Sequence, residues 1–196
     1  KGGGIGQPSD PLDTSYFDPI LQQNNRKEQF QGYCTNIFFD AARRFIELNR
    51  DQPFFAYIST NAPHSPYDVP ESYSSYYKKK GLNDKDARIY GMITNIDENV
   101  GLLLNTLDEL QLAKNTILIF MTDNGATTQH YTAGLRAQKT SVYDGGIRVP
   151  FFLRWPNRFE PAKIDTVGAH IDVLPTILDA VGVNIPEKLM IDGQSL

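Results

Sequence analysis

The sequence predicts an α/β fold in which a mixed or largely parallel sheet is flanked by helices. Two short apolar runs, residues 54–60 and 116–122, are bounded by turn-forming residues, as buried strands are. Between them, residues 89–110 carry apolar side chains at alternating spacings of three and four, the pattern of an amphipathic helix. Strands that alternate with long helices are typical of an α/β domain.

The segments before and after this centre are assigned in order. Residues 1–31 are rich in Gly, Pro, Asp, Asn and Gln without sustained periodicity, so we expect an irregular surface segment. Residues 35–48 repeat apolar side chains at helical spacing, which predicts a helix. A glycine-rich loop at 144–146 precedes an expected strand at 149–155.

A last helix is expected over residues 172–181, since Pro175 would lie in its first turn and Gly182 would end it. Neither a repeat nor a convincing linker divides the chain before about residue 165. We therefore expect residues 1–196 to belong to one domain, with residues 32–196 as its α/β core.

Composition excludes several classes of function. The chain has 196 residues, 40% of them apolar, and 19 basic against 23 acidic side chains give a net charge of -4. This balance argues against a nucleic-acid partner, whose binding surfaces are usually basic. No apolar run approaches the roughly 20 residues of a membrane span. Cys34 is the only cysteine, which excludes an internal disulfide framework and a multi-cysteine zinc site.

A candidate metal site follows the second predicted strand. Open α/β sheets bind ligands beyond the carboxyl ends of their strands. Residues 116–122 are followed at once by Asp123-Asn124-Gly125, whose carboxylate and amide oxygens suit Ca²⁺ or Mg²⁺. A tight turn is the alternative interpretation, because Asn-Gly strongly favours turns.

A histidine and a lysine are predicted to lie near that edge. His64 follows the first predicted strand by four residues, between Pro63 and Pro66, which stiffen its loop. Lys139 lies between the Asp-Asn-Gly turn and the next strand. Either side chain alone could be structural, but a cation, a histidine and a lysine facing one crevice describe a pocket for an oxyanion. The glycine pair 145–146 indicates a positive φ or a close backbone approach.

Short motifs occur along the chain in a characteristic order. They are Tyr16-Phe17-Asp18-Pro19, Gly32-Tyr33-Cys34-Thr35, Asn61-Ala62-Pro63-His64-Ser65-Pro66, Thr94-Asn95-Ile96-Asp97-Glu98-Asn99-Val100-Gly101, Thr122-Asp123-Asn124-Gly125, Gly145-Gly146-Ile147-Arg148-Val149-Pro150 and His170-Ile171-Asp172-Val173-Leu174-Pro175-Thr176. Together they resemble the sulfatase family of the alkaline phosphatase superfamily, and the first two resemble its arylsulfatase-A-like branch.

The resemblance implies a Ca²⁺-dependent hydrolase of small-molecule or glycan sulfate esters, with Mg²⁺ as the alternative ion. In that family a formylglycine hydrate attacks sulfur. By resemblance, Asp123 and Asn124 would be metal ligands, and Asp123 would also lie against the nucleophile's hydroxyls. His64 and Lys139 would contact the sulfate or the leaving oxygen, whereas His170 would be structural. The family also implies a periplasmic, lysosomal or secreted protein.

The nucleophile of the family has no credible counterpart in this sequence. Formylglycine is made from the first residue of a Cys/Ser-x-Pro-x-Arg motif, which the residues after Cys34 do not fit. Residues 9–13 come closest, but Asp13 stands where the arginine would be, and no Asp-Asp pair occurs. We therefore expect the middle and later part of a sulfatase catalytic domain, without its N-terminal portion and its formylglycine. Alone, the chain is expected not to turn over.

Two other functions remain open at this stage. A phosphonate monoester hydrolase or phosphodiesterase resembles sulfatases closely, and a non-catalytic relative could bind anionic sugars around His64 and Lys139. Tyrosines between residues 67 and 77 could stack on a sugar or have ordinary surface and core roles; they are Tyr67, Tyr73, Tyr76 and Tyr77. The basic run at residues 78–80 is expected to be a solvated loop face.

Overall fold

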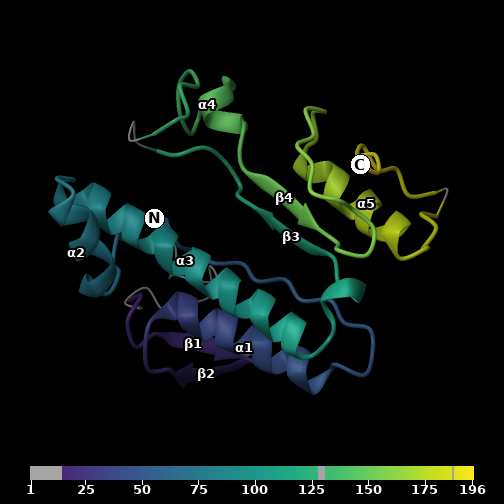
Figure 1. Ribbon diagram of the computed structural model, residues 1–196, viewed down its shortest axis with the longest axis horizontal. Helices are drawn as coiled ribbons and strands as arrows, with labels where there is room; N and C mark the ends of the chain where they lie inside the picture. Colours follow the sequence, from purple (N-terminus) through teal and green to yellow (C-terminus); the bar gives the residue numbers. More distant parts are fainter. Residues whose placement is uncertain (1–14, 128–130, 187) are drawn as a thin grey trace. The chain divides into compact units, whose positions relative to one another are not determined.

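Helices and short strands make up the computed structural model, which describes residues 15–127, 131–186 and 188–196 (Figure 1). The chain forms two compact units, Lys1–Phe159 and Glu160–Leu196. The first unit contains β1 (Ile20–Gln23), β2 (Arg26–Gln29), α1 (Cys34–Leu48), α2 (Glu71–Lys79), α3 (Asp84–Glu109), the 3₁₀ turn η1 (Ala113–Asn115), β3 (Leu118–Met121), α4 (Asp144–Ile147) and β4 (Phe151–Arg154). The predicted α/β class is confirmed. No described helix is both long and apolar enough to cross a membrane.

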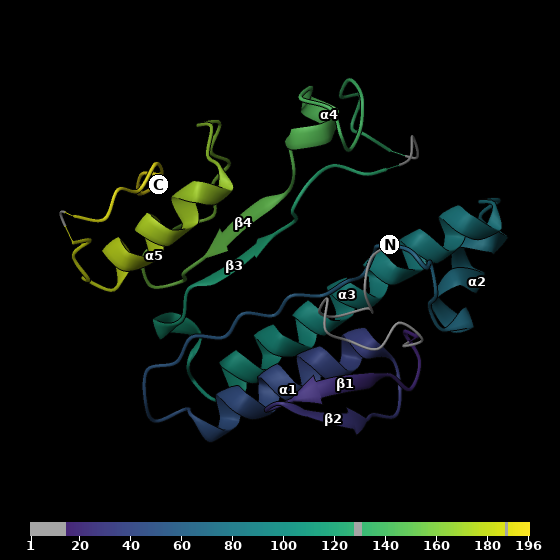
Figure 2. The same cartoon turned by 180° about the vertical axis from the view of Figure 1, so that it is seen from behind.

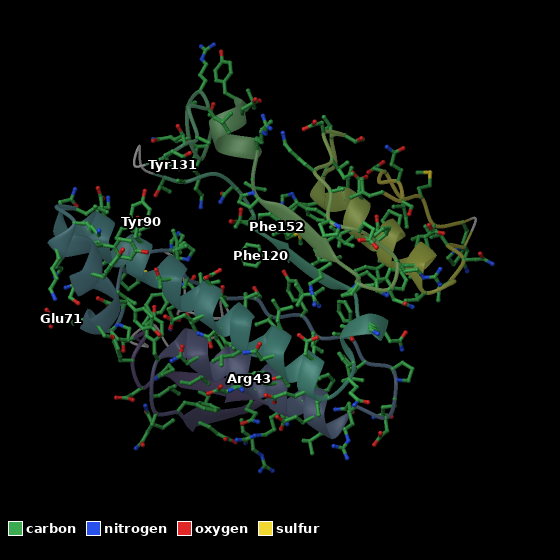
Figure 3. The ribbon with its side chains drawn as sticks, viewed as in Figure 1. Arg43, Glu71, Tyr90, Phe120, Tyr131 and Phe152 are labelled. Carbon is green, nitrogen blue, oxygen red and sulfur yellow. The ribbon has the colours of Figure 1, made fainter. Side chains whose placement is uncertain are left out.

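The described strands form two antiparallel pairs. β3 pairs with β4 from Leu118 opposite Arg154 to Met121 opposite Phe151, and the rings of Phe120 and Phe152 lie 6.2 Å apart on neighbouring strands (Figure 3). These are the strands predicted at 116–122 and 149–155. The glycine-rich stretch before β4 is not a loop but the single helical turn α4.

The expected irregular surface segment is wrong for residues 15–31. β1 and β2 form a hairpin, whose two-residue turn places Asn24 and Asn25 at φ values of 47° and 64°, as a type I′ turn requires. Tyr16 is completely buried and packs in a core cluster with Tyr33 and Met92. The many turn-forming residues of this segment indicated a surface position, so the burial of Tyr16 was not predicted. The remainder of the expected segment, including residues 9–13, lies outside the described residues.

The strand predicted at residues 54–60 is also wrong, because this segment belongs to no helix or strand. Phe54 and Ile58 pack against the second core cluster, around Phe39 and Leu107. Phe55 and Tyr57 point away, with 71% and 75% of their surface exposed. A β-prone sequence becomes a strand only when its backbone groups find a neighbouring strand, and the described residues provide none here.

α1 and α3 pack side by side, as both views show (Figures 1 and 2). Their interface contains buried amides as well as apolar side chains. Asn95 and Asn99 on α3 are 1% and 4% exposed, and both side-chain amides donate to Asn36 Oδ1 on α1, at 2.8 and 2.9 Å. Ile93, which the apolar spacing placed on the buried face, is 45% exposed.

α2 was not expected from the sequence, and it corrects the reading of the basic run at residues 78–80. Lys78 and Lys79 form the last turn of this helix rather than a loop. Lys78 Nζ lies 2.6 Å from Asp84 Oδ1 in the first turn of α3. α2 and α3 lie close together at Gly91, where an added Cβ would lie 3.2 Å from Tyr73 Cβ.

The second unit is organised by one buried carboxylate. It contains the 3₁₀ turn η2 (His170–Asp172) and α5 (Val173–Ala180), close to the helix predicted at 172–181. Asp172 accepts hydrogen bonds from the backbone N–H of Gln194 at 2.9 Å and of Ala169 at 2.7 Å. These bonds lower the pKa of Asp172 below its ordinary value and fasten the end of the chain to the start of α5.

Candidate functional site

Asp123 and Asn124 follow β3 directly, at the end of the strand where the sequence placed the metal site. Asp123 is exposed and Asn124 is half-buried. The Asn124 side-chain amide donates to Asp123 Oδ1 at 2.8 Å. Because this bond uses the amide nitrogen, the amide carbonyl oxygen and Asp123 Oδ2 remain as acceptors for a ligand.

Backbone hydrogen bonds tie this turn to the Lys139 segment. Lys139 N–H donates to the carbonyl of Ala126, and Gly125 N–H donates to the carbonyl of Gly146, each at 2.9 Å. The structure thus brings Lys139 next to the turn that carries Asp123 and Asn124. Of the predicted site residues, these three belong to one group.

Glycines make this close approach possible. A Cβ on Gly145 would lie 2.6 Å from the Arg136 carbonyl oxygen and closer still to that of Ala137. A Cβ on Gly125 would overlap the Gly145 carbonyl oxygen, and one on Gly146 would lie 2.6 Å from the Gln138 carbonyl oxygen. Real Cβ atoms essentially never approach within 3.0 Å. Close backbone approach, rather than a positive φ, therefore explains the glycine pair 145–146.

The backbone around half-buried Lys139 is strained. Ala137 has a φ of 65° and Thr140 a φ of 76°, in the left-handed region that residues other than glycine rarely adopt. Such conformations cost about 1–3 kcal/mol each and persist only where the surroundings impose them. The backbone bonds and the glycine contacts supply that constraint, and they fix the position from which the Lys139 side chain departs.

His64 lies on a different loop. The tautomer of its exposed ring is set by a hydrogen bond. Nδ1 lies 2.8 Å from the carbonyl oxygen of Ser65, and a carbonyl oxygen can only accept a hydrogen bond. Nδ1 therefore carries a proton, and Nε2 is the nitrogen that can face a ligand. No contact joins His64 to Asp123, Asn124 or Lys139 within the described part of the chain.

The protein groups present fit part of a hard-cation site. Within residues 15–127, 131–186 and 188–196, no group of three or more His, Cys, Asp or Glu side chains could hold a metal ion. Asp123 and Asn124 offer two oxygen ligands of the kind that Ca²⁺ and Mg²⁺ prefer, whereas Ca²⁺ takes 6–8. Further oxygens must complete the coordination.

The tyrosines considered for sugar stacking are divided. Tyr73, Tyr76 and Tyr77 line a hollow of about 520 Å³ together with Ser72, Thr94 and Glu98, whereas Tyr67 is not part of its lining. Tyr73 Oη donates to Glu98 Oε2 at 2.6 Å. This bond to a carboxylate and partial burial raise the pKa of Tyr73.

The sulfatase family model matches residues 6–183. The chain belongs to the sulfatase family. It is 31% identical over 190 residues to the uncharacterized sulfatase YdeN of Escherichia coli (strain K12), covering 93% of this chain and 34% of that protein. It is 32% identical over 173 residues to an N-acetylgalactosamine-6-O-sulfatase of Bacteroides thetaiotaomicron, covering 81% and 32%. Human arylsulfatase A is 27% identical over 173 residues, covering 86% and 31%.

Solved structures agree with this assignment. The crystal structure of Ps i-CgsB in complex with k-i-k-neocarrahexaose superimposes with a TM-score of 0.83 at 28% identity, covering 89% of this chain and 40% of that one. A putative sulfatase, yidJ of Bacteroides fragilis, gives a TM-score of 0.75 at 27% identity, covering 90% and 44%. The predicted family and its alkaline-phosphatase-like fold are confirmed. The chain spans about a third of the length of the curated relatives named above.

Proposed function

We propose that the protein containing this chain hydrolyses sulfate esters at the carboxyl end of β3. The observation that carries the proposal is the backbone-locked pairing of the Asp123-Asn124 turn with Lys139 through the Ala126 carbonyl. This pairing holds the backbone of Lys139 next to the turn that carries two oxygen ligands, and an oxygen-held metal ion and an ammonium group together suit an oxyanion substrate. Membership of the sulfatase family supports the same reaction.

Asp123 and Asn124 would hold Ca²⁺, with Mg²⁺ as the alternative, together with oxygens from outside this chain. A bound divalent ion supplies Lewis-acid polarisation of the sulfate oxygens. Lys139 donates hydrogen bonds to those oxygens and balances the charge that develops on them. We place the nucleophile, a formylglycine by family resemblance, outside this chain, so the isolated 196 residues should not turn over.

His64 would act through Nε2. With Nδ1–H held by the Ser65 carbonyl, the imidazolium form presents Nε2–H to the sulfate or to the leaving oxygen. A hydrogen bond or proton delivered to that oxygen lowers the cost of breaking the ester bond.

We propose a small-molecule or glycan sulfate ester as the substrate and a periplasmic, lysosomal or extracellular location. Support for a glycan comes from relatives whose names include an N-acetylgalactosamine-6-O-sulfatase and from a structural neighbour that holds a neocarrahexaose. Support for a small-molecule ester comes from a human steryl-sulfatase, which is 32% identical over 168 residues.

Parallel assays of the full-length protein test the proposal. We expect hydrolysis of 4-nitrophenyl sulfate to exceed that of 4-nitrophenyl phenylphosphonate, and Asp123→Ala to abolish most of it. Asp97→Ala, which removes an exposed carboxylate from α3, should leave the rate unchanged. Faster phosphonate hydrolysis would instead identify a phosphonate monoester hydrolase, and sugar sulfate binding without hydrolysis would identify a binding module.

A further inference from the structure

Tyr16 contacts the His64 loop from the core. Its ring is completely buried, and its hydroxyl donates to the His64 backbone carbonyl at 2.9 Å. The side-chain amide of Asn61 donates to the same hydroxyl at 2.7 Å. One buried hydroxyl therefore joins the start of the loop to the peptide unit of His64.

Rigid neighbours hold Tyr16 in place. Its carbonyl accepts the Cys34 N–H at 2.7 Å, at the first residue of α1. Its ring stacks on Tyr33, with centroids 5.8 Å apart and an interplanar angle of 22°. The first residue of α1 and the stacked Tyr16–Tyr33 rings thus support the His64 loop through Tyr16.

The hydroxyl of Tyr16 is a permanent donor. Burial, reinforced by nearby Tyr33, raises the pKa of Tyr16 far above its ordinary value. The phenol therefore keeps its proton at every pH at which an enzyme works. Its bond to the His64 carbonyl therefore does not vary with pH.

We propose that Tyr16 is a positioning residue for His64: by holding the His64 peptide unit, Tyr16 sets the direction of the His64 Nε2 atom. The ring has its own local bond, from Nδ1 to the Ser65 carbonyl, so the direction of Nε2 depends on the backbone of residues 64 and 65. An exposed side chain on a loop needs such support if it is to meet a reacting atom accurately. This inference rests on the proposed function, because it gives His64 a role in sulfate ester hydrolysis.

A double-mutant cycle in the full-length protein tests the inference. Tyr16→Phe is expected to lower kcat about tenfold with little change in KM. In the His64→Ala background the same substitution should change kcat less than twofold, because no imidazole remains to be positioned. Relative to wild type, the ratio of the rate on phenyl sulfate to the rate on 4-nitrophenyl sulfate should change in the same direction in Tyr16→Phe and in His64→Ala.

Tyr33→Phe is the matched control. Tyr33 is also buried, at 4% exposure, and its hydroxyl donates at 2.8 Å to the carbonyl of Asp68 at the other end of the same loop. This variant should lose similar stability and keep kcat within about twofold. If Tyr16→Phe does not fold, Asn61→Ala replaces it, with a smaller loss of kcat that also vanishes without His64.

The outcomes separate the two proposals. Additive losses in the cycle, or an equal loss of kcat in Tyr33→Phe, would overturn the role of Tyr16 while sulfatase activity stands. An unchanged kcat in His64→Ala would overturn the role assigned to His64 in the proposed function, and the positioning role of Tyr16 with it.

Discussion

Replacing Gly145 with alanine should unfold the Lys139 segment locally and destabilise the protein. The new Cβ would lie 2.6 Å from the Arg136 carbonyl oxygen and 2.7 Å from the Ala137 carbonyl carbon. These are backbone atoms, so no flexible side chain can move aside. The segment must retreat, and the Gly145 N–H loses its 2.8 Å bond to the Arg136 carbonyl. Overpacking and the lost bond together cost about 2–4 kcal/mol.

The displacement should also reduce activity, because Lys139 lies only two residues beyond Ala137. A shift of about 1 Å at a catalytic group can cost about 100-fold in rate. We expect chemical denaturation of full-length Gly145→Ala to show the loss of stability, and kcat on 4-nitrophenyl sulfate to fall by a similar factor of 100.

Gly101→Ala is the control for this pair of measurements. Gly101 lies within α3, and nothing lies within 4 Å of its missing Cβ, so alanine should stabilise the helix by up to about 1 kcal/mol. If Gly145→Ala matched Gly101→Ala in both stability and rate, the close packing around Lys139 would be refuted.

Three further predictions concern single side chains. Lys139→Ala should lower kcat by raising the activation barrier by about 3 kcal/mol. A rate within about twofold of wild type would show that Lys139 is not part of the site. Burial raises the pKa of Tyr33, so the folded state keeps a proton that the unfolded state loses above about pH 10. Stability should therefore fall as pH rises, and Tyr33→Phe should reduce the slope by about 1.4 kcal/mol per pH unit in denaturation titrations. The N–H groups of Gln194 and Ala169 lower the pKa of Asp172, so Asp172→Asn should weaken the loss of stability as pH falls below about 4; an unchanged acid limb would contradict this.

The sequence was informative where one local signal decides the structure. Apolar spacing at residues 35–48 predicted α1, since helix formation depends on local periodicity. The run at 116–122 predicted β3 and with it the position of Asp123 and Asn124 at the end of that strand. The glycine pair 145–146 indicated either a positive φ or a close backbone approach, and the structure shows the close approach.

Long-range partners explain the errors. Residues 54–60 have the composition of a strand, but pairing depends on a distant segment that composition does not specify. Asn95 and Asn99 were missed as core residues because apolar periodicity counts an amide as exposed, whereas their hydrogen bonds to Asn36 make burial of both amides favourable. Tyr16 was noticed only as part of a motif, because its contact with the His64 carbonyl spans 48 positions.

Calcium dependence of the full-length protein tests the central claim most directly. After chelation, the rate of 4-nitrophenyl sulfate hydrolysis is measured against added Ca²⁺ for wild type, Asp123→Ala and Asp97→Ala. If Asp123 and Asn124 hold the ion beside Lys139, Asp123→Ala needs at least about tenfold more Ca²⁺ for half-maximal rate, and Asp97→Ala matches wild type. An unchanged calcium requirement in Asp123→Ala would contradict a metal site at the end of β3.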